Sequence, residues 1–148
     1  MSSILDVCHD MEKEKMTVQL ATPADRQTAA DMLSSHHTGV PGKFPADFLP
    51  ETGIVVRDHS GMVCVIPVYL EQSSSVAVLG HFIADSKVPR KKLREAAFLA
   101  IEGAKRFAKS AGKKHLISLF GRNSINRIAD GCGFQNADSV QEKIIYLN

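Results

Sequence analysis

The sequence predicts a single α/β domain built on a mixed, mostly antiparallel sheet with helices on both faces. Two runs of β-branched residues, 54–56 and 62–70, flank Asp58-His59-Ser60-Gly61, which is typical of an antiparallel hairpin. A strand at 76–84, an amphipathic helix at 89–111 and a strand at 116–120 then form a strand–helix–strand unit, whose strands must be parallel. The 148 residues suffice for one such domain.

The N-terminal third predicts a strand, a helix and a loop. Residues 1–15 are polar and weakly patterned, so we expect a flexible lead-in before a domain spanning residues 16–148. Alternating apolar and polar residues over 16–22 indicate a short strand. Thr22 as N-cap and Pro23 at the first helical position open a helix that ends near 36–39. A loop rich in proline and glycine follows over 38–53, with one helical turn at 45–49.

Three features complete the expected order of elements. Pro67 lies inside the second β-branched run, and its missing N–H requires an edge, a bulge or a bend there. Gly112 is placed to end the long helix as its C′ residue. Residues 125–130 indicate a short helix and 143–147 a final strand.

Composition excludes several classes of protein. The formal net charge of +2 is too small to indicate nucleic-acid binding. Cys8, Cys64 and Cys132 lack C-x-x-C spacing, which argues against a disulfide framework or a zinc ribbon. The sequence contains no secretory signal and no apolar run long enough to span a membrane. We therefore expect a cytoplasmic protein that does not bind a membrane.

Basic residues are concentrated in one region. Ten of the eighteen Lys and Arg residues lie between Lys87 and Lys114. Four of them (Arg90, Lys91, Lys92 and Arg94) fall at the start of the long helix, where the helix dipole disfavours positive charge. A sequence that accepts this cost favours an anion-binding site, although a merely solvated helix face is the simpler alternative.

Two stretches resemble the GNAT superfamily of N-acetyltransferases. The first is VAVLGHFIADSKVPRKKLREAAFLAIEGAKRFAKSAG, and the second is HLISLFGRNSINRIADGCGF. The resemblance covers roughly residues 16–148 and implies the acyl-CoA N-acyltransferase fold. The glycine-free, basic loop and the pair Asn123-Ser124 are similar, more loosely, to GNAT-like internal virion proteins of short-tailed phages.

The resemblance implies acetyl-CoA as cofactor and no metal. Backbone groups of Phe82, Ile83 and Ala84 would pair with the pantetheine arm, and Asn123 would face the cofactor. The pyrophosphate would be held by Val88, Arg90, Lys91, Lys92 and Arg94. Counted back from Gly112, the family's Arg/Gln-x-x-Gly-x-Gly/Ala motif falls on residues 92–97, with Glu95 in place of the middle glycine.

His81 is the candidate general base, because a neutral imidazole suits proton abstraction near pH 7. Glu71 and Asp85, at strand ends, are the alternatives. The plainer interpretations are a hydrogen-bonded strand histidine and two solvated carboxylates. The family's usual acid, a tyrosine on the last helix, corresponds to Ala129 here.

Two functions remain open from the sequence. One is an enzyme that transfers an acetyl or other acyl group to an amine of a small molecule or protein; the acceptor is not specified, and a homodimer is one option. The other is an inactive GNAT-like binding or structural module. The histidines at 36, 37 and 59 lack metal-ligand spacing. Aromatic residues are not interleaved with the basic run, which disfavours nucleic acid.

Overall fold

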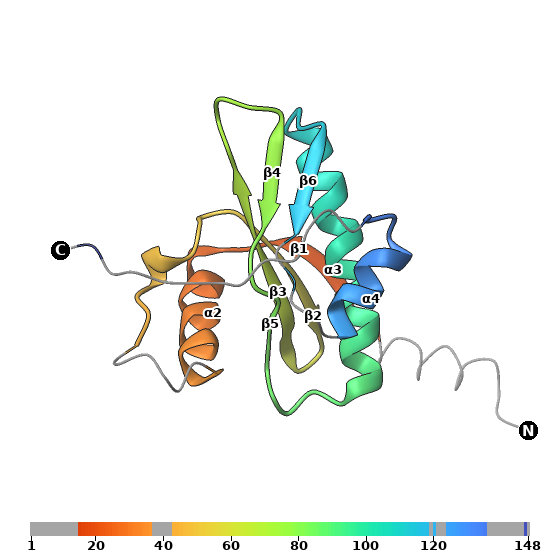
Figure 1. Ribbon diagram of the computed structural model, residues 1–148. Helices are drawn as coiled ribbons and strands as arrows, with labels where there is room; N and C mark the ends of the chain where they lie inside the picture. The colour runs from red at the N-terminus through yellow and green to blue at the C-terminus, as the bar shows by residue number, and fades with distance from the viewer. Residues whose placement is uncertain (1–14, 37–42, 119, 121–123, 136–146, 148) are drawn as a thin grey trace, which may run out of the picture.

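A computed structural model describes residues 15–36, 43–118, 120, 124–135 and 147 of the chain (Figure 1). The N-terminal half contains β1 (Thr17–Leu20), α2 (Pro23–His36), the short 3-10 helix η1 (Ala46–Phe48), β2 (Gly53–Asp58) and β3 (Gly61–Leu70). The C-terminal half contains β4 (Val76–Leu79), β5 (Ile83–Ala84), α3 (Arg90–Ser110), β6 (His115–Ser118) and α4 (Ser124–Gly131).

The strands form one mixed sheet in the order β1-β2-β3-β4-β6, and β5 pairs with β3 beside β4. Neighbouring strands are antiparallel except β4 and β6, which are parallel. Helix α3 makes the crossover between them, as the strand–helix–strand pattern predicts. The predicted fold class, a mixed and mostly antiparallel sheet with helices on both faces, is confirmed.

Helices cover the two faces of the sheet and create two apolar clusters (Figure 1). On one face, α3 and α4 bury side chains of β2, β3 and β4. The sheet-facing side of α3 consists mainly of alanines, which let the helix lie close to the strands; the buried ones are Ala96, Ala97, Ala100, Ala104 and Ala108. On the other face, Ala29, Ala30 and Leu33 of α2 pack against β2, β3 and β5.

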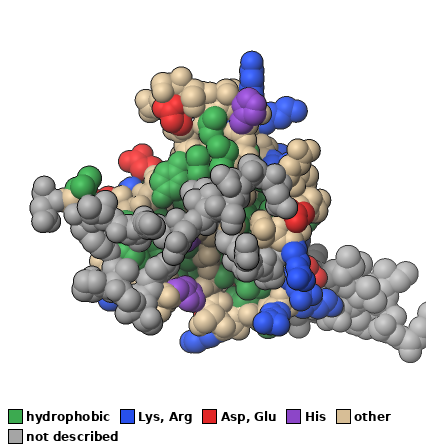
Figure 2. Space-filling model, viewed as in Figure 1, with side chains coloured by type: hydrophobic (Ala, Val, Ile, Leu, Met, Phe, Trp, Pro, Cys, Tyr) green, Lys and Arg blue, Asp and Glu red, His purple; other side chains and the backbone are tan. Residues whose placement is uncertain are grey.

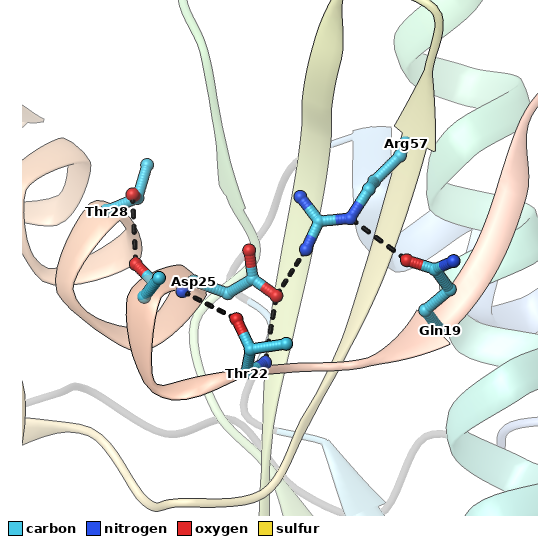
Figure 3. A network of polar contacts seen from close by, with 6 residues as sticks. Gln19, Thr22, Asp25, Thr28 and Arg57 are labelled. Carbon is cyan, nitrogen blue, oxygen red and sulfur yellow. Dashed lines mark hydrogen bonds and ion pairs between the residues drawn. The ribbon is translucent and has the colours of Figure 1, made fainter.

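Thr22 caps the start of α2, as the sequence predicts, and Asp25 returns the bond (Figure 3). The Asp25 amide donates to Thr22 Oγ1 at 3.2 Å, and the Thr22 amide donates to Asp25 Oδ2 at 2.8 Å. Arg57 of β2 forms an ion pair with the buried Asp25 and donates to Gln19 Oε1 at 3.0 Å. Although burial alone raises the Asp25 pKa, the hydrogen bonds from Arg57 and Thr22 bring it below its ordinary value.

The end of α3 also follows the prediction. Gly112 adopts a φ of 81°, and its amide donates to the Lys109 carbonyl at 3.0 Å. The next amide, of Lys113, donates to the Ala108 carbonyl at 3.0 Å, which completes a Schellman motif. The helical turn at 45–49 and the short helix at 125–130 are present as η1 and α4.

One predicted element is wrong. Residues 76–84 are not a continuous strand, because β4 ends at Leu79 and β5 begins at Ile83. The expected lead-in and the final strand at 143–147 lie outside the described residues, apart from Lys15 and Leu147.

Candidate functional site

The interruption between β4 and β5 is a one-residue bulge. Val68 pairs with Leu79, whereas Val65 pairs with Ile83. Ile66 and Pro67 of β3 therefore face the three residues 80–82 on the neighbouring strand. Pro67 has no N–H to donate, but its carbonyl accepts from the Gly80 amide at 2.8 Å. The bend that Pro67 requires thus occurs mainly in the strand opposite it.

The two parallel strands separate beyond this bulge. β6 pairs with β4 from Val76–His115 to Leu79–Ser118, while β5 pairs with β3. Within the described residues, β5 has no pairing with β6. A strand edge that lacks a sheet neighbour can accept a ligand with its own amide groups. Residues 82–84, which the sequence nominates for backbone binding, lie along this separation.

Helix α3 begins at Arg90, after the five residues that follow β5. Its first intrahelical bond runs from the Leu93 amide to the Pro89 carbonyl at 2.9 Å, and Pro89 provides no side-chain cap. The amides of Arg90, Lys91 and Lys92 precede that bond, so they remain available to an anion. Positively charged side chains surround them, and Arg90, Lys91 and Arg94 are exposed.

The backbone amides without a helical bond do not coincide with the residues that the motif count from Gly112 indicates. Residues 92–97 lie within α3, where backbone amides bond to the preceding turn. Ala97 is fully buried against the sheet, so it cannot face a ligand. Arg94 contributes its side chain alone. The backbone donors are those of residues 90–92, one turn earlier than the motif count indicates.

Lys92 has an internal partner at this end of the helix. Its ammonium forms an ion pair with Asp58, whose side chain is 4% exposed and lies in the β2–β3 hairpin. Burial alone raises the Asp58 pKa, but bonds from Lys92 and the Ser60 amide hold it below its ordinary value. The pair anchors the hairpin to α3 and offsets one of the four positive charges.

No protein-family model matches the sequence, and no curated protein is significantly similar to it. Solved structures do match. An aminoglycoside acetyltransferase from an uncultured soil metagenomic sample, in complex with sisomicin, has a TM-score of 0.65 and 11% identity. The match covers 90% of this chain and 97% of that one. This chain has the GNAT acetyltransferase fold.

Two further matches with the acetyltransferase fold span nearly the whole of their own chains. A ribosomal-protein-alanine N-acetyltransferase from Brucella melitensis biovar Abortus 2308 matches with a TM-score of 0.59 and 14% identity, covering 90% of this chain and 100% of that one. AAC(6')-Iy, in complex with the bisubstrate analogue CoA-S-monomethyl-acetylneamine, has a TM-score of 0.63 and 11% identity, covering 90% and 99%. At these identities the likeness establishes the fold.

The three candidate bases lie at different places in this fold. His81 is half-buried within the bulge itself. Asp85 shapes the turn before α3, because its Oδ1 accepts from the Lys87 amide at 3.0 Å and its carbonyl accepts from the Val88 amide at 3.1 Å. Glu71 lies beyond the far end of β3, in the turn leading to β4. Hydrogen bonds from the Ser73 side chain and amide lower its pKa to about 2, which makes it a weak base at neutral pH.

The structure also bears on the remaining residues that the sequence singled out. Asn123 lies outside the described residues. Ala129 of α4, at the family's tyrosine position, is fully buried in the core. Cys64 and Cys132 are buried free thiols, and burial raises their pKa values to about 12 and about 11. Neither thiol is a nucleophile at neutral pH.

Two observations concern ligands and membranes. Among the described residues, no three His, Cys, Asp or Glu side chains lie close enough together to hold a metal ion. None of the helices in that part of the chain is both long and apolar enough to cross a membrane.

The sequence missed two residues of this region. His36, at the end of α2, places Nε2 3.1 Å from the Ala84 carbonyl, and Asp58 pairs with Lys92. Because a carbonyl oxygen can only accept, Nε2 carries the proton and Nδ1 is the basic nitrogen of neutral His36. These contacts join residues 48 and 34 positions apart, so no local pattern reveals them.

Proposed function

We propose that this chain is an acyl-CoA-dependent N-acetyltransferase of the GNAT superfamily that acetylates an amine. The observation that carries the proposal is the bulge at residues 80–82, where the chain leaves β4, the partner of β6, and continues through β5 to the uncapped amides of a basic helix start. The acetyltransferase fold and a structural neighbour that holds a CoA-containing analogue support it. An amine acceptor is consistent with the aminoglycoside bound by another neighbour.

The first turn of α3 fits CoA because it carries positive charge and has backbone amides that are free to donate hydrogen bonds. Amides of Arg90, Lys91 and Lys92 bind the pyrophosphate, with the side chains of Arg90, Lys91 and Arg94 adding positive charge. Val88 positions the turn that leads to them. Backbone groups of Phe82, Ile83 and Ala84 pair with the pantetheine amides. Acetyl-CoA supplies the activated acyl group as a thioester.

Proton transfer is assigned to the bulge. The acceptor enters as an ammonium and must lose a proton before it is nucleophilic, so the site needs a base that is unprotonated near pH 7. His81 takes this proton on a ring nitrogen, and Asp85 is the alternative nearby base. His36 orients the Ala84 backbone by donating to its carbonyl. Most of the rate enhancement comes from holding amine and thioester together.

The first test is binding of CoA by calorimetry and thermal shift. We expect CoA to raise Tm with ligand concentration and the double variant Arg90→Ala/Lys91→Ala to weaken affinity about tenfold. A matched control removes two exposed lysines from the other end of α3, Lys109→Ala/Lys114→Ala, and leaves CoA affinity unchanged. Absence of a shift at millimolar CoA would contradict the proposal.

The second test is turnover with acetyl-CoA and a panel of amines, including sisomicin and a peptide that begins with alanine. With an accepted amine, His81→Ala should lower kcat with little change in KM. If Asp85→Asn produces this loss and His81→Ala does not, the base is Asp85.

A second candidate function is an inactive binding module with the same fold. The Lys92–Asp58 pair favours it, since an internal carboxylate already occupies one of the cations expected for pyrophosphate. The glycine-free start of α3 and the buried Ala129 agree with it. CoA binding without turnover on any amine would support this candidate over the enzyme.

A further inference from the structure

A second basic region lies at the opposite end of α3. There, a pocket of about 400 Å³ opens between the last turns of the helix and the start of β6. Five cationic or titratable side chains line it: Lys105, Lys109, Lys113, Lys114 and His115. Since a 21-residue helix is about 30 Å long, this pocket is far from the amides at Arg90. The proposed cofactor site does not account for it.

Two of the lysines are held in place by backbone carbonyls. Lys113 donates to the carbonyls of Glu71 and Ser74, the latter at 2.8 Å, which ties it to the β3–β4 turn. Lys105 donates to the Cys132 carbonyl at 2.7 Å and pairs with Glu102 at 3.0 Å. A carbonyl positions an ammonium group without neutralising it. The charge of Lys113 therefore remains available to a ligand.

The other two lysines are exposed. In the described part of the chain, the side chains of Lys109 and Lys114 make no hydrogen bond or ion pair. His115 is also exposed, and its Nδ1 lies 2.9 Å from Ser75 Oγ. Figure 2 shows basic side chains and a histidine gathered at the top of the molecule, where Figure 1 places the start of β6. The helix dipole accounts for Lys109 in the last turn, but Lys113 and Lys114 follow the helix.

The two nearest carboxylates have partners of their own, although the charge of Lys113 also contributes to lowering the Glu71 pKa. Glu102 pairs with Lys105, on the α3 side of the pocket. The carboxylate of Glu71 is directed into its own turn, where Ser73 donates to it at 2.7 Å and 3.0 Å. Ala108 and Leu116 give the pocket an apolar floor. The site thus presents lysines around a small hydrophobic surface.

We propose that this pocket binds an acidic peptide segment of a partner protein, with one apolar side chain on Ala108 and Leu116 and flanking carboxylates on the lysines. A lysine ammonium is a compact charge that suits separate carboxylates, whereas an arginine guanidinium binds phosphate through two parallel hydrogen bonds. None of the described residues that line the pocket is an arginine. Its described lining residues include no Phe, Tyr or Trp, which disfavours stacking of nucleic-acid bases. The open rim at Lys109, Lys114 and His115 suits an extended segment rather than an enclosed metabolite.

The test uses the full chain and a fluorescein-labelled peptide with one leucine flanked on both sides by aspartate and glutamate. We expect binding by fluorescence anisotropy that weakens as salt is raised. Lys109→Ala/Lys114→Ala should lower affinity about fivefold, the effect of losing two exposed ion pairs. The charge-matched control, Lys91→Ala/Arg94→Ala at the other end of α3, should leave it unchanged.

Two further probes give the remaining outcomes. A peptide with asparagine and glutamine in place of the acids should not bind, and replacing the leucine with serine should weaken binding. The proposal is overturned if the acidic peptide does not bind, if both double variants weaken it equally, or if an oligothymidylate binds more tightly at the same salt. Circular dichroism of each variant verifies that a loss of binding is not a loss of folding.

Discussion

The two ends of α3 are both basic, but the fold treats them in opposite ways. At the N-terminal end, Pro89 provides no side-chain cap and three amides precede the first helical bond. At the C-terminal end, Gly112 completes a Schellman motif that satisfies the last carbonyls. Basic side chains oppose the helix dipole at the first end and agree with it at the second.

Basic side chains at the N-terminal end of α3 therefore lower the stability of the fold, whereas those at the C-terminal end raise it. Basic residues at the start of α3 are unfavourable for the isolated protein, which points to an anionic ligand there. Lys109 at the other end needs no ligand to explain its position, and the proposal for that end rests on the pocket and on the anchored Lys113. Composition alone would have merged these regions into one basic run.

The largest expected effect concerns the C-terminal end. Gly112→Ala should lower the free energy of unfolding by about 1–2 kcal/mol, because Gly112 has a φ of 81° that an L side chain adopts at a cost. An added Cβ meets no atom within 4 Å, so the cost is conformational. Gly131→Ala, also in open space but without a positive φ, is the matched control in urea titrations and should stay within about 0.5 kcal/mol. Equal effects would mean that Gly112 is not the residue that fixes this end.

A pH-dependent difference is expected at the N-terminal end. Its anchor is Asp58, whose pKa is lowered in the folded state, while the C-terminal end is anchored on carbonyls that do not titrate. A lowered folded-state pKa means that the pair stabilises the protein fully above about pH 4 and that this stability is lost as pH falls through the folded-state pKa.

Asp58→Asn measures this contribution. We expect the variant to be less stable than wild type by about 1 kcal/mol at pH 6, and the difference to shrink toward zero on acidification. Hydrogen exchange should show faster opening of the hairpin and the first turn of α3, with the residues around Gly112 unchanged. A difference that does not change with pH would show that the effect does not arise from the ion pair.

The smallest expected effect is on stability, from reversing one exposed charge at each end of α3, and it tests the helix-dipole argument directly. Lys91→Glu should stabilise the ligand-free protein by about 0.5 kcal/mol, and Lys109→Glu should destabilise it by a similar amount. Both side chains are exposed, so packing contributes little to either change. Urea titrations at low ionic strength measure the two values. If Lys91→Glu is destabilising, the basic start of α3 stabilises the fold and ceases to indicate a ligand.

Local signals in the sequence predicted most of the fold. Thr22 and Pro23 identified the start of α2, Gly112 identified the end of α3, and the amphipathic pattern over residues 89–111 identified that helix. These signals work because capping, positive φ and helical periodicity depend on residues within one or two turns. The β-branched runs and the turn at residues 58–61 likewise identified the β2–β3 hairpin.

The candidate site was predicted less completely. The sequence showed that Pro67 must disturb the sheet, but it did not show that the bulge would form opposite, at residues 80–82. Counting back from Gly112 placed the family's motif on residues 92–97, most of which lie within α3, whereas the amides that precede the first helical bond are those of residues 90–92. The contacts of His36 and Asp58 connect distant segments and were not foreseen.

The sequence by itself therefore determined the order of the elements, the caps of α2 and α3 and the concentration of basic residues along α3. Only the tertiary structure decided which of those charges stay available, because an ion pair or a carbonyl anchor depends on what another strand or turn brings within about 3 Å. Lys92 is occupied by Asp58 from a hairpin 34 residues away, whereas Lys113 is held by carbonyls and keeps its charge. Helix periodicity is local, but the neutralisation of a charge is a property of the packed fold.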